Sequence, residues 1–314
     1  MKYGIDLMTT QFNYWYLPYL MPCFRRYRIT DHNPVSNQTK QRIISDPNLS
    51  MRWIHHYLIR YIREMRIPMH NATGGRRNNS AFRNVLYHRK YGKIAFNRYF
   101  YILDISSAYS TVNIHQLTGI LSEFCADISQ EDICEFLTMY CFEPDNKGLV
   151  TGAPASPDLF NLYCEKLIDG YLRELCTKYN LVYTRYIDDL TFSSTVPIGL
   201  KKRKEIRKII RKAGFEISDR KAKVIDLRKG PTTINGVGIC LDGRTFLPRR
   251  VLKQIQALIH RALEKGDIKP SIIHGKMSLL KAVTLPGYRT MTESRVFGMY
   301  NKYCASIKDS EYTN

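Results

Sequence analysis

The sequence has no pair of cysteines in a C-x-x-C spacing, and the eight cysteines that it contains are scattered. Most of them lie within apolar patterns that are typical of helices. This arrangement excludes a zinc site built from Cys pairs and a disulfide framework, because both need clustered or regularly spaced cysteines. We therefore interpret the cysteines as buried free thiols of a protein that works in the reducing cytoplasm.

A long hydrophobic run is also missing, since no stretch of about 18 apolar residues occurs in the chain. Residues 1–24 are apolar and aromatic, but Asp6, Gln11 and Asn13 interrupt them. They also lack the charged start and the small-residue cleavage site of a signal peptide. The sequence predicts a packing segment there and no membrane partner.

Acidic residues are few: 28 Asp and Glu stand against 48 Lys and Arg, which gives a formal net charge of +20. A large positive excess is typical of proteins that bind polyphosphates, because cationic side chains release the counterions of a nucleic acid backbone. Nucleic acid is therefore the first partner to expect. The 314 residues contain no internal repeat and are enough for two or three packed subdomains.

Hydrophobic periodicity predicts a chain that mixes helices and strands first and ends in helices alone. The expected helices are apolar or amphipathic segments, at 48–66, 113–142, 156–179, 199–213, 249–265, 270–284 and 291–308. The expected strands are a buried run at 98–106, a hairpin at 184–194 that turns at two aspartates, and a hairpin at 232–248 that turns at Asp242–Gly243. Residues 33–47 are polar and turn-rich, and residues 71–80 form a basic loop rich in Gly and Asn.

Three aspartates are placed where they can form one carboxylate cluster. Asp104 ends the strand at 98–106, and Asp188 and Asp189 lie at the tip of the first hairpin. They converge if these strands are neighbours in one antiparallel sheet. Converging carboxylates repel each other, and a divalent cation such as Mg²⁺, which prefers oxygen ligands, removes the repulsion. Two such ions about 3.5 to 4 Å apart would suit nucleotidyl transfer.

A plainer interpretation is that Asp104 is a strand-end acid and that Asp188 and Asp189 are ordinary turn residues. The surrounding motifs favour the metal site. "YIDD" (186–189) resembles the Tyr-x-Asp-Asp box of reverse transcriptases, and "LDISSAYSTV" resembles their first palm motif, with Asp104 as its metal-binding acid. Between them, "LVTGAPASPDLFNL" (149–162) is similar to the Gly-x-x-x-Ser-Pro segment of the family, and the three motifs occur in the family's order.

Further segments resemble the retron-type bacterial branch of that family, from about residue 42 onward. "NVLYH" (84–88) is similar to the Asn-x-x-x-His element of the branch, and "INGVGICLDGRTFLPRR" is similar to its region after the palm. The resemblance implies an α+β fold with right-hand polymerase architecture: fingers, an antiparallel-sheet palm and a short helical thumb. We expect an N-terminal segment and fingers at 1–95, the palm at 96–240 and the thumb at 241–314.

The resemblance also implies a set of site residues around the palm. Asp104 and Asp188 are expected as direct metal ligands, with the carbonyl of Ile105 as a further oxygen. Asp189 is expected to support the site, because adjacent side chains at a hairpin tip point in different directions. Lys221 matches a family lysine that binds or protonates the pyrophosphate leaving group, or it is simply a solvated side chain.

Other residues are expected to contact the nucleotide or the nucleic acid. Tyr109 lies where the resemblance places a steric gate against a ribose 2′-hydroxyl, although a core tyrosine is the ordinary alternative. The remaining candidates for the nucleotide are small or basic residues near the motifs: Thr151, Gly152, Ser156, Arg76 and Arg77. The candidates for nucleic acid are Arg83, Asn84, His88, Arg249, Arg250 and Lys253, of which Asn84 and His88 have a structural alternative.

The leading functional hypothesis is an RNA-directed DNA polymerase that uses two Mg²⁺ ions and dNTPs to copy a dedicated noncoding RNA into DNA. The retron resemblance implies a role in antiphage defence with a separate effector protein. Val150–Thr151 stands where the family usually has Pro-Gln, which keeps open a stand-alone defence reverse transcriptase that makes repetitive or untemplated DNA. A catalytically inactive RNA-binding module is the non-enzyme alternative.

Overall fold

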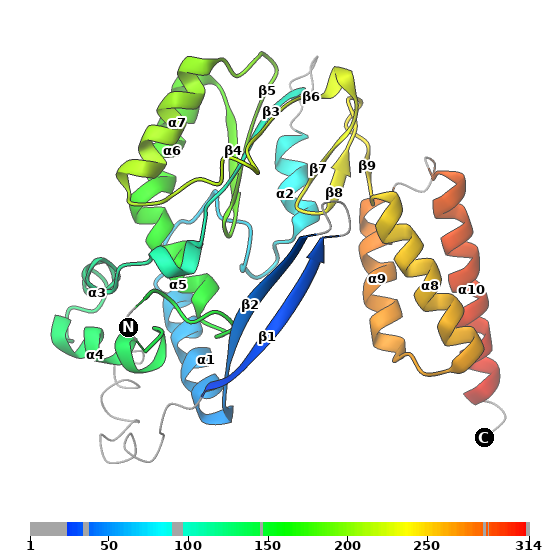
Figure 1. Ribbon diagram of the computed structural model, residues 1–314, viewed down its shortest axis with the longest axis horizontal. Coiled ribbons are helices and arrows are strands. Elements are labelled where there is room, and N and C mark those ends of the chain that lie inside the picture. Colours follow the sequence, from blue (N-terminus) through cyan, green and yellow to red (C-terminus); the bar gives the residue numbers. More distant parts are fainter. Residues whose placement is uncertain are drawn as a thin grey trace. The chain divides into compact units, whose positions relative to one another are not determined.

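The computed structural model of the chain describes residues 24–33, 38–89, 97–144, 147–284, 287 and 289–311 (Figure 1). The packing segment predicted at 1–24 therefore lies, apart from Phe24, outside the described residues. The chain divides into two compact units. The first contains Met1–Asn79, Ile102–Leu190 and Gly199–Ala222, and the second contains Ser80–Tyr101, Thr191–Ile198 and Lys223–Asn314. The boundaries between fingers, palm and thumb stay predictions.

The first unit begins with a two-stranded ribbon that the sequence did not predict. Strands β1 (Phe24–Asn33) and β2 (Gln38–Pro47) pair antiparallel over their whole length, from Phe24 opposite Pro47 to Asn33 opposite Gln38. The alternation of apolar and polar residues that identifies a half-buried strand is absent here, because most of the described β1 side chains are exposed to solvent. The sequence therefore predicted a polar, turn-rich segment at 33–47 and no strand.

Helices of the first unit pack around apolar stripes that agree with the predicted periodicity. Helix α1 (Leu49–Glu64) is capped by Asn48 and buries Met51, Ile54, Leu58 and Ile62 against α4 and α5. The other helices are α3 (Ile114–Ser122), α4 (Gln130–Tyr140), α5 (Ser156–Cys164), α6 (Gly170–Tyr179) and α7 (Leu200–Lys212). A π-helical turn at Glu165–Asp169 joins α5 to α6.

A four-stranded sheet in the order β4-β5-β3-β6 carries the predicted carboxylates. Strands β4 (Val182–Tyr186) and β5 (Asp189–Ser194) form the predicted hairpin, and β3 (Tyr99–Asp104) lies beside β5. The amide of Ile105 donates to the carbonyl of Asp188, and the amide of Arg98 donates to that of Ser194, so β3 and β5 run antiparallel. The fourth strand is β6 (Lys223–Asp226).

The second unit combines a small sheet with the C-terminal helices. Helix α2 (Ala81–His88) packs on a three-stranded sheet of β7 (Thr232–Ile234), β8 (Val237–Ile239) and β9 (Thr245–Phe246). Asp242–Gly243 lies in the turn between β8 and β9, as predicted. A second turn at Asn235–Gly236, between β7 and β8, was not predicted.

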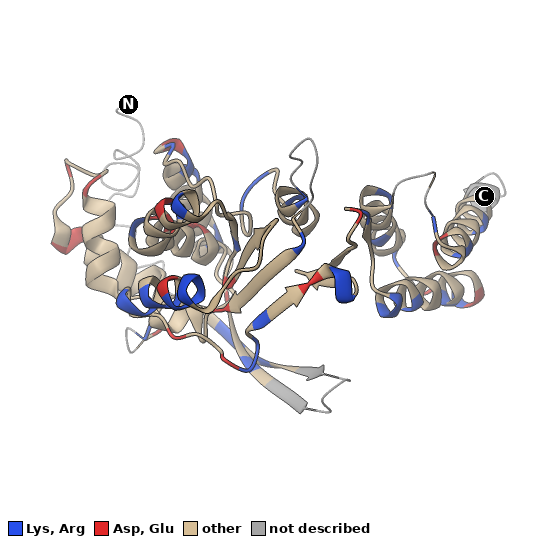
Figure 2. Cartoon of the chain, turned by 90° about the horizontal axis from the view of Figure 1, so that it is seen from above, with Lys and Arg blue, Asp and Glu red and all other residues tan. Residues whose placement is uncertain are grey.

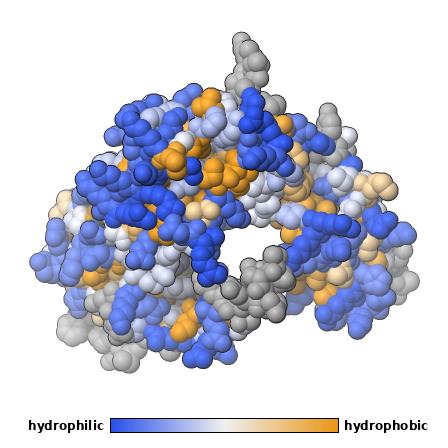
Figure 3. All heavy atoms as spheres, turned by 45° about the horizontal axis from the view of Figure 1, so that its top comes forward, coloured by the Kyte–Doolittle hydropathy of each residue, from blue (hydrophilic) through white to orange (hydrophobic). Residues whose placement is uncertain are grey.

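Three helices end the chain at almost the predicted positions: α8 (Arg249–Lys265), α9 (Pro270–Val283) and α10 (Met291–Glu311). Within this bundle α8 packs against both α9 and α10. Across the described residues, no helix combines the length and apolar character that a membrane crossing requires. The face of the molecule shown in Figure 3 is largely hydrophilic, with scattered apolar patches of the kind that most folded surfaces show.

Candidate active site

The structure brings Asp104 and Asp188, both in the first unit, together where β3 ends and the β4–β5 turn leads into β5. The amide of Ile105 donates to the carbonyl of Asp188, with the two atoms 2.9 Å apart. The amide of Ser218 donates to the carbonyl of Asp104, also at 2.9 Å. The end of β3, the β4–β5 turn and the segment that leads to Lys221 are therefore joined by backbone hydrogen bonds, which fixes where the carboxylates can lie.

The two carboxylates interact electrostatically, and both are at least half-buried. The pKa of Asp188 is raised above its ordinary value, first by burial and then by the negative charge of Asp104, while Lys221 and Arg42 oppose the shift. The Lys221 ammonium lies 2.6 Å from Asp104 Oδ1 and forms an ion pair with it. A positive charge thus already compensates the acid that the sequence predicts as a metal ligand.

These residues fit a hard divalent cation, although they supply only part of its coordination. Within the described part of the chain, no three His, Cys, Asp or Glu residues are grouped as a complete metal site. The oxygen donors that converge are the carboxylates of Asp104 and Asp188. The Ile105 amide bonds to the Asp188 carbonyl, and in extended backbone the carbonyl of a residue points to the same side as its amide, so the Ile105 carbonyl also faces the turn. Mg²⁺ is commonly held by one or two carboxylates plus waters and substrate phosphates, and such a partial set suits it.

Asp189 is placed differently from Asp188. It is the first residue of β5, whereas Asp188 belongs to the turn. The two acids therefore belong to different local structures, and their unequal roles stay a prediction.

The turn that carries Asp188 contains a strained residue. Ile187 has φ of 58°, in the left-handed region that β-branched residues rarely adopt. Gly74 packs directly against it: a Cβ on Gly74 would lie 2.6 Å from the Ile187 amide nitrogen. The basic loop at 71–80 therefore approaches the turn closely, and it does so because residue 74 has no side chain.

The buried side chain of Arg185 is hydrogen-bonded to this turn. Arg185 is fully buried, pairs with both carboxylate oxygens of Asp169, and also donates to the Ile187 carbonyl at 3.0 Å. Its remaining bond goes to Asn161 Oδ1, and the amide group of Asn161 in turn donates to the Gly74 carbonyl. One hydrogen-bond network thus links the π-helical turn, α5, the basic loop and the peptide before Asp188.

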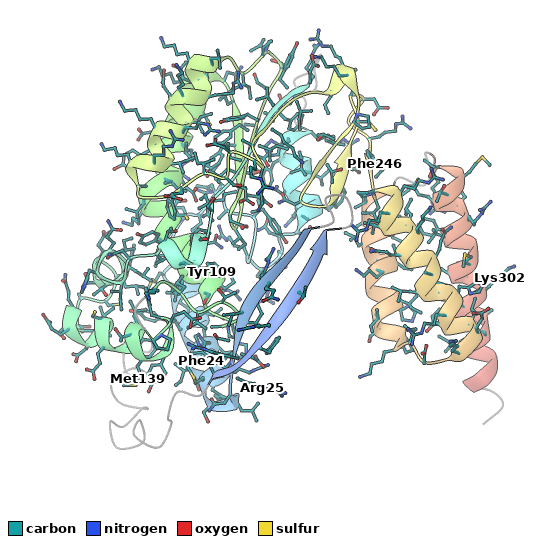
Figure 4. All side chains as sticks on the ribbon, in the orientation of Figure 1. Phe24, Arg25, Tyr109, Met139, Phe246 and Lys302 are labelled. Atoms are coloured by element: carbon teal, nitrogen blue, oxygen red, sulfur yellow. The ribbon has the colours of Figure 1, made fainter. Side chains whose placement is uncertain are left out.

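Tyr109 lies next to the carboxylates, on the short 3₁₀-helix Ala108–Thr111, beside α5 (Figure 4). Its ring packs edge-on against Phe160 with centroids 5.5 Å apart. The pKa of its hydroxyl is raised, mainly by burial and further by the charge of Asp188, which places the two side chains close together. Tyr109 is therefore a core contact, and its hydroxyl lies within electrostatic range of Asp188.

The loop before α5 docks on strand β2. The amide of Ser45 donates to the Thr151 carbonyl at 2.8 Å, and Gly152 has φ of 109°, with room for no side chain because a Cβ would lie 2.7 Å from Ile44 Cγ2. The buried hydroxyl of Ser156 donates to the Val150 carbonyl at 2.6 Å. Gly152 therefore permits a close approach of the ribbon, and Ser156 shapes the loop from inside.

Of the other residues predicted to contact the nucleotide or the nucleic acid, some are exposed to solvent and others are bonded within the protein. Arg77 and Arg83 are exposed, and Arg76 donates to the Met69 carbonyl. Asn84 and His88 are fully buried in the second unit, where they bond to Asn235 Oδ1 at 2.6 Å and Ser193 Oγ at 2.8 Å. Full burial favours their structural alternative over contact with RNA. On α8, the three predicted cations are all exposed: Arg249, Arg250 and Lys253.

Two functional candidates escaped the sequence analysis. Arg42, on the unpredicted strand β2, lies close enough to lower the pKa of Asp188. No pattern in the sequence predicted that this segment pairs with another strand. Arg185 did carry a signal, because an arginine within the apolar pattern of a buried strand needs a buried acid as its partner.

Comparisons with known proteins agree with this geometry. The family model for reverse transcriptase (RNA-dependent DNA polymerase) matches residues 30–241. The retron Ec73 reverse transcriptase of Escherichia coli is 24% identical over 249 residues, which cover 76% of each chain. The retron Ec86 reverse transcriptase of the same organism is 24% identical over 270 residues, which cover 85% of this chain and 79% of the relative.

Similar folds occur among solved structures. Telomerase from Candida albicans in complex with a fragment of telomeric RNA matches with a TM-score of 0.52 at 11% identity, over 84% of this chain and 55% of that one. The corresponding complex from Candida tropicalis matches with a TM-score of 0.51 at 13% identity, over 95% of this chain and 57% of that one. The chain thus spans little more than half the length of these structures, and the similarity concerns the fold.

Proposed function

This chain belongs to the reverse transcriptase family and is a retron-type RNA-directed DNA polymerase, and from this premise we propose that it copies a dedicated noncoding RNA into DNA with Asp104 and Asp188 at its catalytic centre. The observation that carries the proposal is the convergence of the buried carboxylate of Asp104 and the half-buried carboxylate of Asp188 beside a lysine at the tip of the hairpin. The retron names of its relatives support the noncoding RNA as template and its DNA copy as product.

In the proposed mechanism, Asp104, Asp188 and the Ile105 carbonyl would hold Mg²⁺, and Asp189 would support them from the start of β5. Bound Mg²⁺, as a pair of ions, would supply charge stabilisation for the attacking and leaving oxygens of the phosphoryl transfer. The acids would fix the place, at the ends of the strands, where the bound cations bring the primer terminus and the triphosphate of a dNTP together. This positioning is the main contribution that the chain itself makes to such a reaction.

Lys221 is proposed to neutralise the leaving pyrophosphate. Its side chain is 57% exposed, so it can leave Asp104 and turn toward a phosphate when a cation takes over the charge of the carboxylate. An ammonium in this place stabilises negative charge that develops on the leaving group and can donate a proton to it.

Tyr109 is proposed as the steric gate that selects deoxynucleotides. Its ring is held against Phe160 and lies near Asp188, where the sugar of an incoming nucleotide would be placed. A fixed ring excludes a 2′-hydroxyl by its volume. Thr151 and Gly152, on the loop that meets β2, and Ser156, which shapes that loop, complete this side of the nucleotide site in the proposal.

Basic residues are proposed to bind the polyanions. Arg42, Arg76 and Arg77 would bind the triphosphate, since guanidinium groups match phosphate oxygens with paired donors. Arg83 and the three cations at the start of α8, Arg249, Arg250 and Lys253, would contact template or product backbone. Asn84 and His88, being buried, would support α2 beneath that surface.

The biological setting is proposed from the retron relatives: a bacterial cytoplasm, a noncoding RNA that stays with the enzyme, and a separate effector that acts in antiphage defence. A stand-alone defence reverse transcriptase remains the second candidate, because Thr151 stands beside the nucleotide site in place of the family's usual Gln. Sequencing the nucleic acid that copurifies with the protein separates the two. A branched RNA–DNA hybrid supports the retron, and long repetitive DNA supports the second candidate.

The direct test of the enzyme function is dNTP incorporation on a primed RNA template with Mg²⁺. We expect Asp104→Asn and Asp188→Asn to lower the rate by at least about 10³-fold, since each removes a ligand that holds the charge of the transition state. Asp132→Asn, an exposed acid in the first turn of α4, is the matched control and should leave the rate unchanged. Activity that survives both active-site substitutions would refute the assignment.

A further inference from the structure

Helix α7 has an unusual concentration of positive charge. Its thirteen residues contain eight Lys and Arg and a single acid, Glu205. Blue, the colour of Lys and Arg, accordingly dominates the ribbon of this helix in Figure 2. Five of its cations are exposed, and we call them the α7 ridge: Lys201, Lys204, Lys208, Arg211 and Lys212.

The ridge lies on one side of the helix. With about 100° of rotation per residue, its five members fall within an arc of about 100°. Ile206 and Ile210, both fully buried, lie on the opposite side and attach the helix to the first unit, where α7 packs on α6. The ridge is therefore the outermost line of the helix, and along the axis it extends for about 16 Å.

The ridge cations lack the acidic partners that arginines elsewhere in the chain have. In the stretches that the structure describes, none of the five forms an ion pair, whereas the half-buried Arg207 of the same helix pairs with Asp219 at 2.5 Å. Exposed arginines on other elements also have partners, as in the pairs Arg60–Glu64 and Arg228–Asp226. Like charges three and four residues apart destabilise a helix, so this arrangement works against folding unless an external anion compensates it.

The charges that act on the catalytic carboxylate are those of Asp104, Lys221 and Arg42, and no ridge residue is among them. The ridge is thus a surface separate from the carboxylate cluster. It also differs from a membrane-binding helix, which needs an apolar face free to enter lipid, because the apolar face of α7 is already packed against the protein.

From this geometry we infer that the α7 ridge binds the phosphate backbone of double-stranded nucleic acid outside the polymerase site. A duplex segment of about 16 Å carries about ten phosphates, enough to engage all five cations. The ridge contains no aromatic side chain on which an unpaired base could stack, so it recognises backbone rather than sequence. It would hold a folded, double-stranded part of a bound nucleic acid while another part is copied.

The test uses the full chain, with its polymerase site first saturated by a short unlabelled RNA–DNA primer–template. Binding of a labelled 30-base-pair RNA duplex, a length of about three helical turns, is then followed by fluorescence anisotropy over a range of salt concentrations. The triple variant Lys201→Gln/Lys204→Gln/Lys208→Gln should bind about tenfold more weakly or worse. When the logarithm of its association constant is plotted against the logarithm of the salt concentration, the slope should be shallower than that of the wild type by about 2.5 to 3. This is close to one unit for each phosphate that the variant no longer neutralises.

Two controls separate the ridge from total charge and from folding. Lys201→Arg/Lys204→Arg/Lys208→Arg keeps the charge and should bind like the wild type. Lys265→Gln/Lys269→Gln/Lys276→Gln removes the same charge from exposed positions in the second unit and should change affinity less than twofold, about 0.4 kcal/mol. Extension of the short primer–template should be equal in all four proteins, and loss of that activity would concern the polymerase function alone.

Equal affinity of the Gln ridge variant and the wild type would overturn the inference, as would a wild type that does not bind the duplex. Binding of the ridge to vesicles of phosphatidylcholine and phosphatidylserine, without binding to duplex RNA, would assign the surface to a membrane and equally refute it.

Discussion

Among the hairpin turns that the structure describes, the β4–β5 and β7–β8 turns both pass through left-handed backbone, and they do so by opposite means. The turn between β7 and β8 uses Asn235 at φ of 48° and Gly236 at φ of 83°, residues that adopt this region readily. The turn between β4 and β5 places Ile187 at φ of 58°, although a β-branched side chain resists that conformation. Strain is thus present at the turn that carries Asp188 and avoided at the other.

The difference shows what holds each turn in place. The Asn235–Gly236 turn is favoured by its own residues, and a Cβ on Gly236 would meet no other atom within 4 Å. The Ile187 turn depends on distant parts of the chain: Arg185 bonds its carbonyl, Asp169 fixes Arg185, and Gly74 leaves space for it. Local strain supported by a buried network is typical of functional sites.

Of the substitutions that test this difference between the two turns, removal of Arg185 should have the largest effect on stability. Arg185→Met leaves the carboxylate of Asp169 buried without a cation, which should lower the free energy of unfolding by about 3 to 5 kcal/mol. Urea denaturation followed by circular dichroism measures the loss. The matched control is Arg173→Met. It removes the partly exposed arginine that pairs with Glu165, a residue of the same π-helical turn as Asp169, and should lower the free energy of unfolding by less than about 2 kcal/mol. Equal losses for the two variants would show that the buried network has no special role.

A methyl group on Gly74 should strain the Ile187 turn directly. Gly74→Ala places a Cβ against the Ile187 backbone, and we expect it to cost about 1 to 3 kcal/mol and to slow dNTP incorporation. The control is Gly119→Ala in α3, where nothing lies within 4 Å of the new Cβ; there the same substitution should stabilise the protein by about 0.5 to 1 kcal/mol. A Gly74→Ala protein with unchanged stability and rate would contradict the close approach.

A substitution in the Asn235–Gly236 turn should change the stability of the protein but not its rate of dNTP incorporation. Gly236→Ala forces an alanine into left-handed backbone without any clash, at a cost of about 1 kcal/mol. Because this turn carries no catalytic group, the rate of dNTP incorporation at saturating substrate should stay equal to that of the wild type. A lowered rate in a fully folded Gly236→Ala protein would mean that the two turns are not as different as we describe.

The smallest expected change in stability is a gain at the active site itself. The folded-state pKa of Asp188 lies above its unfolded value of 3.8, so the folded protein binds this proton more tightly. The stabilising effect of that proton is complete below pH 3.8 and is lost as the pH rises through the raised pKa. Without metal, Asp188→Asn should therefore raise the melting temperature at pH 7.

This gain should shrink as the pH approaches 3.8, where Asp188 of the wild type is itself protonated. Differential scanning calorimetry in EDTA at several pH values measures the dependence. A variant that melts below the wild type at pH 7 would show that the ionised carboxylate is not destabilising.

The sequence predicted those parts of the molecule whose cause is local or whose motif is complete. The α8 helix was predicted to the residue because its apolar stripe is regular and Gly266 ends it. The β4–β5 hairpin was also predicted, and the structure meets the condition for convergence of the aspartates, because β5 lies beside β3. The fold class is confirmed, because the family model and the structural neighbours both support it.

The features that escaped prediction depend on contacts between distant segments. The β1–β2 ribbon has no apolar alternation, and its place next to Gly152 follows from the fit of Ile44 and Ser45 against that loop. The strain at Ile187 could not be predicted from the tetrapeptide YIDD, because it results from Gly74 and Arg185 acting together. The burial of Asn84 and His88 likewise depends on their bonds to Asn235 and Ser193, more than a hundred residues away.

We propose that the buried side chain of Arg185 positions the turn that carries Asp188, in addition to stabilising the fold. The most direct test is single-turnover dNTP incorporation by the variant Arg185→Met/Asp169→Leu/Tyr183→Phe, which replaces the ion pair and the tyrosine hydroxyl bonded to Asp169 by apolar groups of similar size. We predict a protein that remains folded, with a KM for dNTP within about threefold of the wild type, or about 0.7 kcal/mol. Its rate at saturating dNTP should be lower by at least about tenfold, because the peptide before Asp188 has lost the donor that orients it. A folded variant that incorporates dNTP as fast as the wild type would contradict the account.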